Sequence, residues 1–305
     1  MNDKLHSVDT LQKWLDDHNY ISNRLLATSI FLALKMEKPL FLEGEAGVGK
    51  TEVGKVLSRM LSTELIRLQC YEGLDVHNAV YEWNYSRQII QIRLLEASGK
   101  TDKEDMTHEI FGPEFLIKRP LLQAVDHNSD RPPVLLIDEL DRADEEFEAF
   151  LLEILSDFQV TIPEIGTIIA KKKPIVVITS NRTREIHDAL KRRCLYHWID
   201  YPTAQREFEI VQRKISEINE SLGKQVVAFV QAMREMDLYK LPGIAETLDW
   251  SVALVKLGTT ELTEQVTRDT LGTLLKYQDD IERVNGDMTQ LLIEKAMADA
   301  STIHS

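Results

Sequence analysis

The stretch GEAGVGKT, from Gly44 to Thr51, decides the fold of this chain. It matches the pattern G-x-x-x-x-G-K-[ST], in which glycines let the backbone approach anionic oxygens closely. The apolar run PLFLEG before it predicts a strand, and the apolar residues after it recur at the spacing of an amphipathic helix. Strand, glycine-rich turn and helix are the context that the motif requires. We therefore predict a loop whose backbone N–H groups face phosphates at a helix N-terminus, rather than an ordinary turn.

The bound species that this loop predicts is ATP with Mg²⁺. We expect Lys50 to place its charge near the β- and γ-phosphates and Thr51 to offer its hydroxyl to Mg²⁺. The candidate nucleotide-binding residues are Gly44, Glu45, Ala46, Gly47, Val48, Gly49, Lys50 and Thr51.

A second motif, PPVLLIDELD, runs from Pro132 to Asp141. Its apolar part predicts a buried strand that ends in Asp138 and Glu139. Two carboxylates at the end of a buried strand are costly unless they are solvated or coordinated. Beside a phosphate loop, Asp138 is the expected Mg²⁺ residue and Glu139 the base that orients and deprotonates a water. The alternative, an acidic turn that caps the next helix, explains this motif only if the phosphate loop is ignored.

The charge balance limits the partners of this chain. Its 36 basic and 50 acidic residues give a net charge of −14. General nucleic-acid binding needs a basic surface, so we expect none, although a local basic pore in an assembly stays possible. The polar N-terminus and the short apolar stretch Leu25–Met36 predict neither a secretory signal nor a membrane span, so we expect a soluble, cytoplasmic protein. The two cysteines, Cys70 and Cys194, are expected to be small buried hydrophobes rather than a disulfide or a zinc site.

Strand and helix patterns alternate along the first two thirds of the chain and predict a parallel sheet with helices on both faces. The predicted strands are Leu40–Leu42, Leu65–Gln69, Val134–Ile137, Ile175–Thr179 and Trp198–Tyr201. From Thr203 onward the patterns are helical, at Glu207–Ile218, Val226–Met236, Thr247–Leu257, Leu262–Leu275 and Ile281–Met297. We therefore predict an α/β domain over residues 1–202 and a small helical domain over residues 203–305.

Two segments exceed what a minimal α/β core needs. Residues 73–120 form a long insertion, and residues 159–174 predict a β-hairpin around Pro163-Glu164-Ile165-Gly166. In the insertion, Tyr81, Trp83 and Tyr85 alternate with polar residues. These aromatic residues either pack against a helix in the core or contact a substrate or partner, and the sequence leaves both interpretations open.

The motifs together resemble an AAA+ ATPase: the phosphate loop, the strand ending in Asp138-Glu139, ITSN at Ile178–Asn181 and ALKRRCLYHW at Ala189–Trp198. The insertion and hairpin resemble the MoxR branch. The stretches RLQCYEGLD, AVYEWNYSRQ, LLIDELDRADEEFEAFLLEILSDFQVTIPE and PGIAETLDW are similar to the CoxD-type MoxR proteins, named for carbon monoxide dehydrogenase maturation. The resemblance covers roughly residues 20–260 and implies a P-loop parallel sheet flanked by helices, followed by an all-α lid.

The resemblance also implies an activity and partners. Such proteins hydrolyse ATP as homo-hexameric rings that remodel or activate a client enzyme, often with a partner that bears a von Willebrand factor A domain. It implies that Asn181 positions the attacking water, and that Arg193 or Arg192, with Arg193 favoured, is an arginine finger. One departure is clear: the lid segment PGIAETLDW has Glu246 and Thr247 where the family usually has an arginine.

Two other functions stay open at this point. One is a nucleotide-dependent switch or scaffold with little turnover, which the presence of Glu139 argues against because a pure switch needs no base. The other is a DNA-directed AAA+ motor, which the net charge of −14 argues against.

Overall fold

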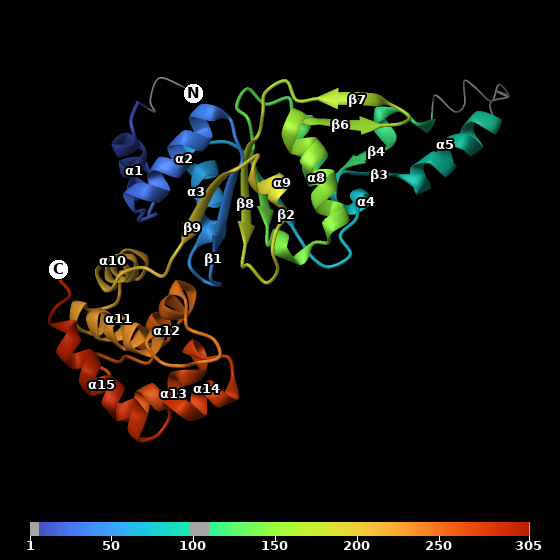
Figure 1. The fold of residues 1–305 in the computed structure, drawn as a ribbon. Coiled ribbons are helices and arrows are strands. Elements are labelled where there is room, and N and C mark those ends of the chain that lie inside the picture. The colour runs from blue at the N-terminus through green and yellow to red at the C-terminus, as the bar shows by residue number, and fades with distance from the viewer. Residues whose placement is uncertain (1–5, 98–109, 305) are drawn as a thin grey trace. The chain divides into compact units, whose positions relative to one another are not determined.

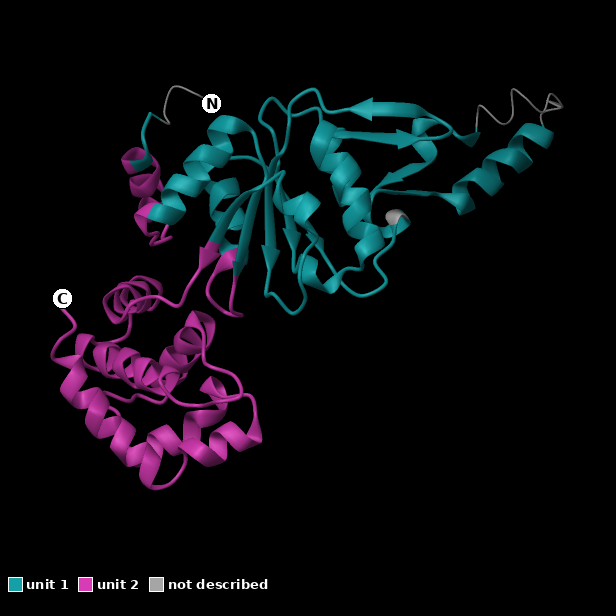
Figure 2. Cartoon of the chain, in the orientation of Figure 1, with its two compact units in different colours: residues 1–8, 25–43, 51–197 teal, residues 9–24, 44–50, 198–305 magenta. Residues whose placement is uncertain are grey.

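The chain divides into two compact units, each of which combines segments distant in sequence. The structure is a computed structural model that describes residues 6–97 and 110–304. Unit 1 comprises residues 1–8, 25–43 and 51–197, and unit 2 comprises residues 9–24, 44–50 and 198–305 (Figure 2). The predicted boundary between residues 202 and 203 stays a prediction.

A central five-stranded sheet confirms the predicted α/β class (Figure 1). Its strand order is β2-β5-β8-β1-β9, and the β2–β5, β5–β8 and β8–β1 pairs are parallel. Strands that are far apart in the sequence are therefore neighbours in the sheet. This order is typical of parallel strands, which must be joined by long crossover connections that usually contain a helix. The sheet strands are β1 (Leu40–Gly44), β2 (Leu65–Gln69), β5 (Val134–Asp138), β8 (Ile175–Ser180) and β9 (Leu195–Ile199).

Helix α2 precedes β1, and the other elements of the α/β part lie between the sheet strands along the chain. The helices are α2 (Arg24–Met36), α3 (Lys50–Leu61), α4 (Val76–Ala79), α5 (Tyr85–Ala97), α7 (Pro120–Val125), α8 (Glu145–Asp157) and α9 (Asp188–Lys191), with 3-10 turns η1 (Pro113–Phe115) and η2 (Leu140–Arg142). The short strands are β3 (Tyr81–Trp83), β4 (Leu116–Lys118), β6 (Gln159–Ile162) and β7 (Gly166–Ile169).

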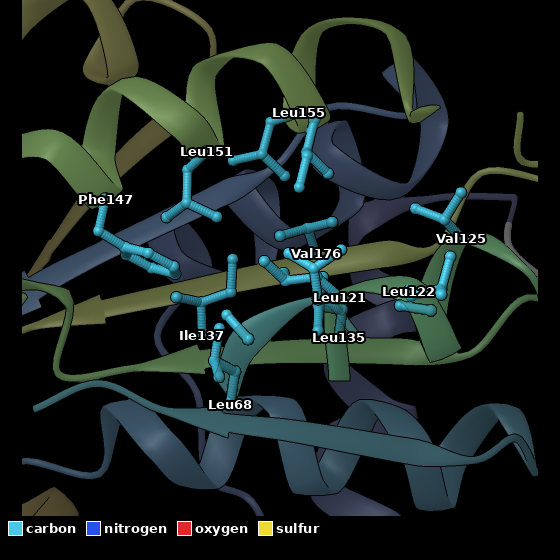
Figure 3. Packing of buried hydrophobic residues seen from close by; sticks show 14 of the residues in the cluster. Leu68, Leu121, Leu122, Val125, Leu135, Ile137, Phe147, Leu151, Leu155 and Val176 are labelled. Atoms are coloured by element: carbon cyan, nitrogen blue, oxygen red, sulfur yellow. The ribbon is translucent and has the colours of Figure 1, made fainter. Parts of the chain in front are cut away.

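Both faces of the sheet are covered. On one face, Phe147, Leu151 and Leu155 of α8 point toward Leu135 and Ile137 of β5 and Val176 of β8, and α7 adds Leu121, Leu122 and Val125 (Figure 3). On the other face, Leu136 lies against Gly54 of α3, where an added Cβ would meet its Cδ1 at 3.2 Å. Because successive strand residues point to opposite faces that are both covered, β5 is apolar from Val134 to Ile137, and all five of its residues, Asp138 included, are buried.

The described part of the insertion resolves the open question about its aromatic residues. Trp83 is 6% exposed and packs edge-to-face on Phe111, with ring centroids 5.1 Å apart. Core packing is therefore the correct interpretation for Trp83. Tyr85 begins helix α5 and is 61% exposed, so it is free of the core. Residues 98–109 of the insertion lie outside the described residues.

The predicted hairpin is confirmed: β6 and β7 pair antiparallel around the turn before Gly166. The last predicted sheet strand is displaced. Instead of Trp198–Tyr201, β9 spans Leu195–Ile199 and is separated from the end of α9 by residues 192–194; at its start the Leu195 N–H donates to the Pro39 carbonyl (2.8 Å). The half-buried, mixed composition of LYHWI gave no clear period from which to place its start.

Unit 2 contains α1 (Val8–Asp17) and a bundle whose core includes Trp250 and Phe229, both fully buried with ring centroids 5.2 Å apart. The predicted helix Ile281–Met297 is wrong in one respect, because the chain breaks into two helices at Gly286, whose φ of 74° is left-handed. The bundle helices are α10 (Ala204–Lys214), α11 (Glu220–Arg234), α12 (Ile244–Lys256), α13 (Glu264–Leu274), α14 (Gln278–Val284) and α15 (Asp287–Ala300).

Across residues 6–97 and 110–304, no helix combines the length and apolar character that crossing a membrane requires.

Candidate active site

The predicted phosphate loop connects β1 to α3. Lys50 opens α3 and is 5% exposed; its Nζ donates to the carbonyl oxygens of Gly44 (2.8 Å) and Glu45 (2.6 Å). Two glycines are sterically required. A Cβ on Gly44 would lie 2.2 Å from the Ile199 carbonyl oxygen, and Gly47 has a φ of 79°. At these two positions any side chain would collide with the chain or strain its backbone, so the loop needs glycine there.

The carboxylate of Asp138 is the centre of the site in unit 1. It is 1% exposed and accepts hydrogen bonds from three elements. Thr51 Oγ1 of α3 (2.8 Å) and Thr179 Oγ1 of β8 (2.6 Å) donate to Oδ1. Arg67 of β2 donates to Oδ2 from Nε (3.1 Å) and Nη2 (2.6 Å). The burial of this charge is thus offset by four donors, two of them from a guanidinium.

The Thr51–Asp138 pair fits Mg²⁺. It brings a hydroxyl and a carboxylate oxygen within 2.8 Å of each other, and hard oxygen donors are what this ion prefers. In the described ranges, no group of three or more His, Cys, Asp or Glu gathers as a metal cage. One or two protein oxygens suffice for Mg²⁺, since it takes its other ligands from phosphates and water.

Glu139 follows directly and leaves the strand in a left-handed conformation, with φ 56° and ψ 51°. Its N–H donates to Thr179 Oγ1 (2.9 Å), and its Oε2 pairs with Arg142 Nε (2.9 Å). This strained conformation turns the side chain out of the strand, where it is 35% exposed. The carboxylate can therefore meet solvent, which a base acting on water requires.

Asn181 follows β8, the strand next to β5 in the sheet. A buried carboxylate, Asp141, fixes the turn that carries it: Oδ1 accepts from the Asn181 N–H (3.1 Å), and Oδ2 accepts from the Thr183 N–H (2.9 Å) and Oγ1 (2.6 Å). Burial acts to raise the pKa of Asp141, but these hydrogen bonds from Thr183 and Asn181 outweigh it, so the pKa lies below its ordinary value.

The thiol of Cys70 is buried near these carboxylates. It follows β2 and is 1% exposed. Burial raises the pKa of its thiol to about 12, and the charges of Asp138, Asp141 and Glu139 add to that effect. Cys70 and the half-buried Cys194 are both free thiols, as the sequence predicts.

The two candidate finger arginines lie at the end of α9. Arg193 is held within this chain, with Nε donating to Ser156 Oγ (2.7 Å) and Nη1 to the Ala189 carbonyl (3.0 Å). Arg192 has a side chain that is 82% exposed and approaches Asp188 only at 4.0 Å. Of the two, Arg192 is the freer to reach outward, whereas the sequence favours Arg193.

In unit 2 the first turn of α12 meets the phosphate loop. The Ala245 N–H donates to the Gly47 carbonyl (3.2 Å), and Glu246 Oε2 accepts from the Gly243 N–H (2.9 Å) in a capping box. A Cβ on Gly47 would lie 2.8 Å from that same Glu246 oxygen. A carboxylate, rather than an arginine, therefore stands beside the loop.

Arg234, in the helical bundle of unit 2, holds the segment that leads into α12. Arg234 of α11 forms a bidentate pair with the fully buried Glu207 (2.6 and 2.7 Å), and its Nε donates to the Pro242 carbonyl (2.8 Å). Its guanidinium lies 4.7 Å from the centre of the Tyr201 ring. Burial, with the charge of Glu45, raises the pKa of Tyr201 to about 12, while Arg234 lowers it. Arg234 is thus committed to holding the segment that leads into α12.

Sequence reasoning missed three residues of the site. Thr179 and Asp141 stand inside the motifs already singled out, ITSN and LLIDELD, so their polar character inside or beside a buried strand was a usable signal. Arg67 gave none, since a charged residue in the pattern LIRLQ reads as a solvent-facing strand position.

Comparisons with known proteins give one family match. The model of the AAA domain (dynein-related subfamily) matches residues 39–194. A comparison with curated proteins finds no match. Among solved structures, a point mutant of RuvB from Thermotoga maritima is 16% identical, covers 98% of this chain and 83% of its own, and gives a TM-score of 0.47.

Two further structures are similarly remote. The RuvB Holliday junction branch migration motor of Thermotoga maritima is 16% identical, with 92% of this chain and 80% of its own covered and a TM-score of 0.45. A candidate ATPase from Cytophaga hutchinsonii is also 16% identical, with 95% and 94% covered and a TM-score of 0.47.

The lowered pKa of Asp141 predicts a pH-dependent contribution to stability. Its folded pKa lies below the unfolded value of about 3.9, so this contribution is full above that value and is lost as pH falls through the folded pKa. Urea unfolding should show wild type more stable than Asp141→Asn at about pH 6, with the gap narrowing toward about pH 3. A gap that stays constant or widens on acidification contradicts this assignment.

Proposed function

Residues 39–194 place this chain in the AAA domain family (dynein-related subfamily), and we propose that it hydrolyses ATP in a ring to remodel or activate a client protein. The observation that carries the proposal is the hydrogen bond between Thr51 and Asp138 (2.8 Å). It joins the first turn of the helix after the phosphate loop to the carboxyl end of β5, where a nucleotide-bound Mg²⁺ is expected. Glu139 follows at the next position.

The roles of the chain's own groups follow from their placement. Lys50 and the loop backbone bind the phosphates, and Thr51 with Asp138 would hold Mg²⁺, which supplies charge neutralisation at the phosphates. Glu139 orients a water and takes its proton, while Asn181 hydrogen-bonds to that water. Asp138 is buried and already accepts four hydrogen bonds, whereas the Glu139 carboxylate is 35% exposed, so Glu139 is the residue proposed as the base.

The Glu139→Gln variant tests the base because it preserves shape and removes the proton acceptor. We expect ATP and Mg²⁺ binding to persist while kcat falls by at least about 10²-fold. Equilibrium binding of a fluorescent ATP analogue and single-turnover hydrolysis measure the two effects separately. Lys50→Ala is the contrasting variant, which should lose nucleotide binding itself. Turnover close to wild type in Glu139→Gln disproves the assignment.

A switch or scaffold with little turnover is the second candidate. The ion pair between Glu139 and Arg142 (2.9 Å) favours it, because the base is engaged within its own protomer. In the chaperone proposal, the client or a neighbouring subunit releases this pair. Measurement of kcat with and without the client separates the two functions, since a switch stays slow in both states.

The ring proposal rests on the finger arginines. Arg192 and Arg193 are both exposed at the surface, where Arg192 Nη2 lies 4.0 Å from Asp188 Oδ2 and Arg193 donates to two neutral acceptors, Ser156 Oγ and the Ala189 carbonyl. A guanidinium supplied by a neighbour offsets charge that grows on the γ-phosphoryl oxygens, and in other NTPases it is worth about 10³ to 10⁵ in kcat. A homo-hexamer is the ring that we propose, and its active sites are complete only between subunits.

Mixed rings test whether the arginine acts in trans. The acceptor Arg192→Ala/Arg193→Ala should bind ATP but not hydrolyse it, and the donor Lys50→Ala should do neither. Their mixture should regain part of the wild-type ATPase rate, and the specific activity of wild type should fall on dilution. A dead mixture in demonstrably mixed rings, or full activity of a dilute monomer, refutes the proposal. The single variants Arg192→Ala and Arg193→Ala then identify the finger.

Client or partner contact is proposed for the insertion. Helix α5 turns Gln88 and Leu95 inward but leaves Tyr85, Ile89, Ile90 and Leu94 between 54% and 61% exposed. So many large apolar side chains on one short helix mark an interaction surface. The partner that we propose for this surface is a client enzyme, and the resemblance to CoxD-type proteins favours a metalloenzyme. A protein with a von Willebrand factor A domain is the alternative partner.

Substitutions in the insertion separate contact from packing. Tyr85→Ala with Leu94→Ala should fold normally and keep basal ATPase within about twofold, because exposed positions rarely cost more than about 0.5 kcal/mol. Activation of the client that co-purifies with the native protein should fall. Trp83→Ala is the packing control and should lose about 3–5 kcal/mol of unfolding free energy. Unchanged client activation in the double variant argues against this surface.

A further inference from the structure

Two buried carboxylates hold the two ends of α9, the short helix that ends at Arg192 and Arg193. The first is Glu148 of α8, which is 1% exposed, and the second is Glu43 of β1, which is 3% exposed. Neither belongs to the site described above. We name residues 184–193 the finger segment, because they lead from the turn after β8 to the candidate finger arginines.

Glu148 holds the entry to this segment. Its Oε1 forms an ion pair with Arg184 Nη1, and its Oε2 accepts from the N–H of His187 (2.8 Å), the residue that caps α9. The same Arg184 guanidinium also donates from Nε to the carbonyl of Ala143 (3.0 Å). Side chain and backbone of the finger segment are therefore bound to the chain that follows Asp138 and Glu139.

Weaker contacts hold the exit. Lys191 Nζ, at the last position of α9, lies 3.4 Å from Glu43 Oε1 and 5.8 Å from the centre of the Phe41 ring. Arg193 Nε donates to Ser156 Oγ of α8 (2.7 Å). Helix α8 thus contacts the segment at both ends, through Glu148 and through Ser156.

A carboxylate that is 1% exposed is costly unless its partners stay in place, so it fixes their positions more firmly than an exposed ion pair does. Asn181 has a separate anchor, Asp141, and the contacts of Glu148 begin only at Arg184. Asp141 therefore holds the proposed water-positioning residue of the same protomer, whereas Glu148 holds the finger segment.

We propose that Glu148 is a positioning residue for catalysis in trans: it orients the finger segment so that an arginine of this protomer reaches the nucleotide of its neighbour. The inference rests on the proposed trans-acting arginine. It makes a directional claim, since loss of the Glu148 carboxylate should impair the site that receives the arginine and not the site in the same subunit.

Mixed rings test which active site loses activity when the Glu148 carboxylate is removed. The acceptor is Arg192→Ala/Arg193→Ala, and the donor is Lys50→Ala. Glu148→Gln, which keeps the shape but loses the charge that pairs with Arg184, is introduced into the donor in one mixture and into the acceptor in another. We expect the restored ATPase rate to fall about tenfold or more with the donor variant, since small misplacements of a catalytic group cost up to about 10²-fold. With the acceptor variant, the rate should stay within about twofold.

The matched control is Glu153→Gln in the donor, an exposed carboxylate on the same helix, which should leave the restored rate unchanged. Native mass spectrometry confirms that mixed rings form, and thermal unfolding confirms that each variant folds. If Glu148→Gln does not fold, Arg184→Lys removes the two-sided contact while keeping the charge, and it should show the same donor-only loss.

Equal losses in donor and acceptor, or no loss in the donor, overturn the positioning role of Glu148. If the mixture without any change at position 148 is already inactive, the trans-acting arginine itself is wrong, and the inference falls with it. The two failures are thus distinguished by the parent mixture.

Discussion

The cost of burying the Asp138 carboxylate organises the active-site side of this protein. A charge that is 1% exposed must be matched by donors, and here they come from α3, β8 and β2 through Thr51, Thr179 and Arg67. Removing a donor would leave part of a buried charge without compensation, so the three elements are held in one arrangement. The hydrogen bond from Thr51 also places its hydroxyl beside a carboxylate oxygen, so the contact that stabilises the buried charge is the same one that the proposed Mg²⁺ site would use.

A series of carboxylates extends this principle along the chain that follows β5. Asp141 fixes the turn at Asn181, and Glu148 fixes Arg184 and the cap of α9. Each is buried, and each accepts hydrogen bonds from backbone as well as side chains. The segment from Asn181 to Arg193, for which we proposed a water-positioning residue and a finger arginine, is therefore not a free loop. Its geometry depends on the turn at Asp141 and on α8, both of which follow Asp138 and Glu139 along the chain.

Unit 2 also contains a buried carboxylate, Glu207, whose hydrogen bonds fix the positions of its neighbours. The bidentate pair of Arg234 and Glu207 is buried, and Thr247 Oγ1 (2.7 Å) and Gln231 Nε2 (2.8 Å) complete the hydrogen bonding of the carboxylate. A buried pair of this kind contributes little net stability but fixes one arrangement of its neighbours. Here those neighbours are Pro242 and the first turn of α12, which meets Gly47 of the phosphate loop. An arginine is thus used to shape the segment, and Glu246 stands where the family resemblance led us to look for an arginine.

The sequence by itself determined the fold class, the phosphate loop and the Asp138-Glu139 pair, because these depend on local patterns: hydrophobic periodicity, glycines in a turn, and charges at the end of an apolar run. It also located the hairpin and most helices. It misplaced β9 and ran α14 and α15 together, since a half-buried edge strand and a single left-handed glycine leave weak periodic signals. Only the tertiary structure decided that Trp83 is core while Tyr85 is exposed, that Arg67 of β2 neutralises Asp138, and that Glu148 holds the finger segment. The last two assignments join Arg67 to Asp138, 71 positions apart, and Glu148 to His187, 39 positions apart. A charge in a sequence does not reveal which distant partner offsets the cost of its burial.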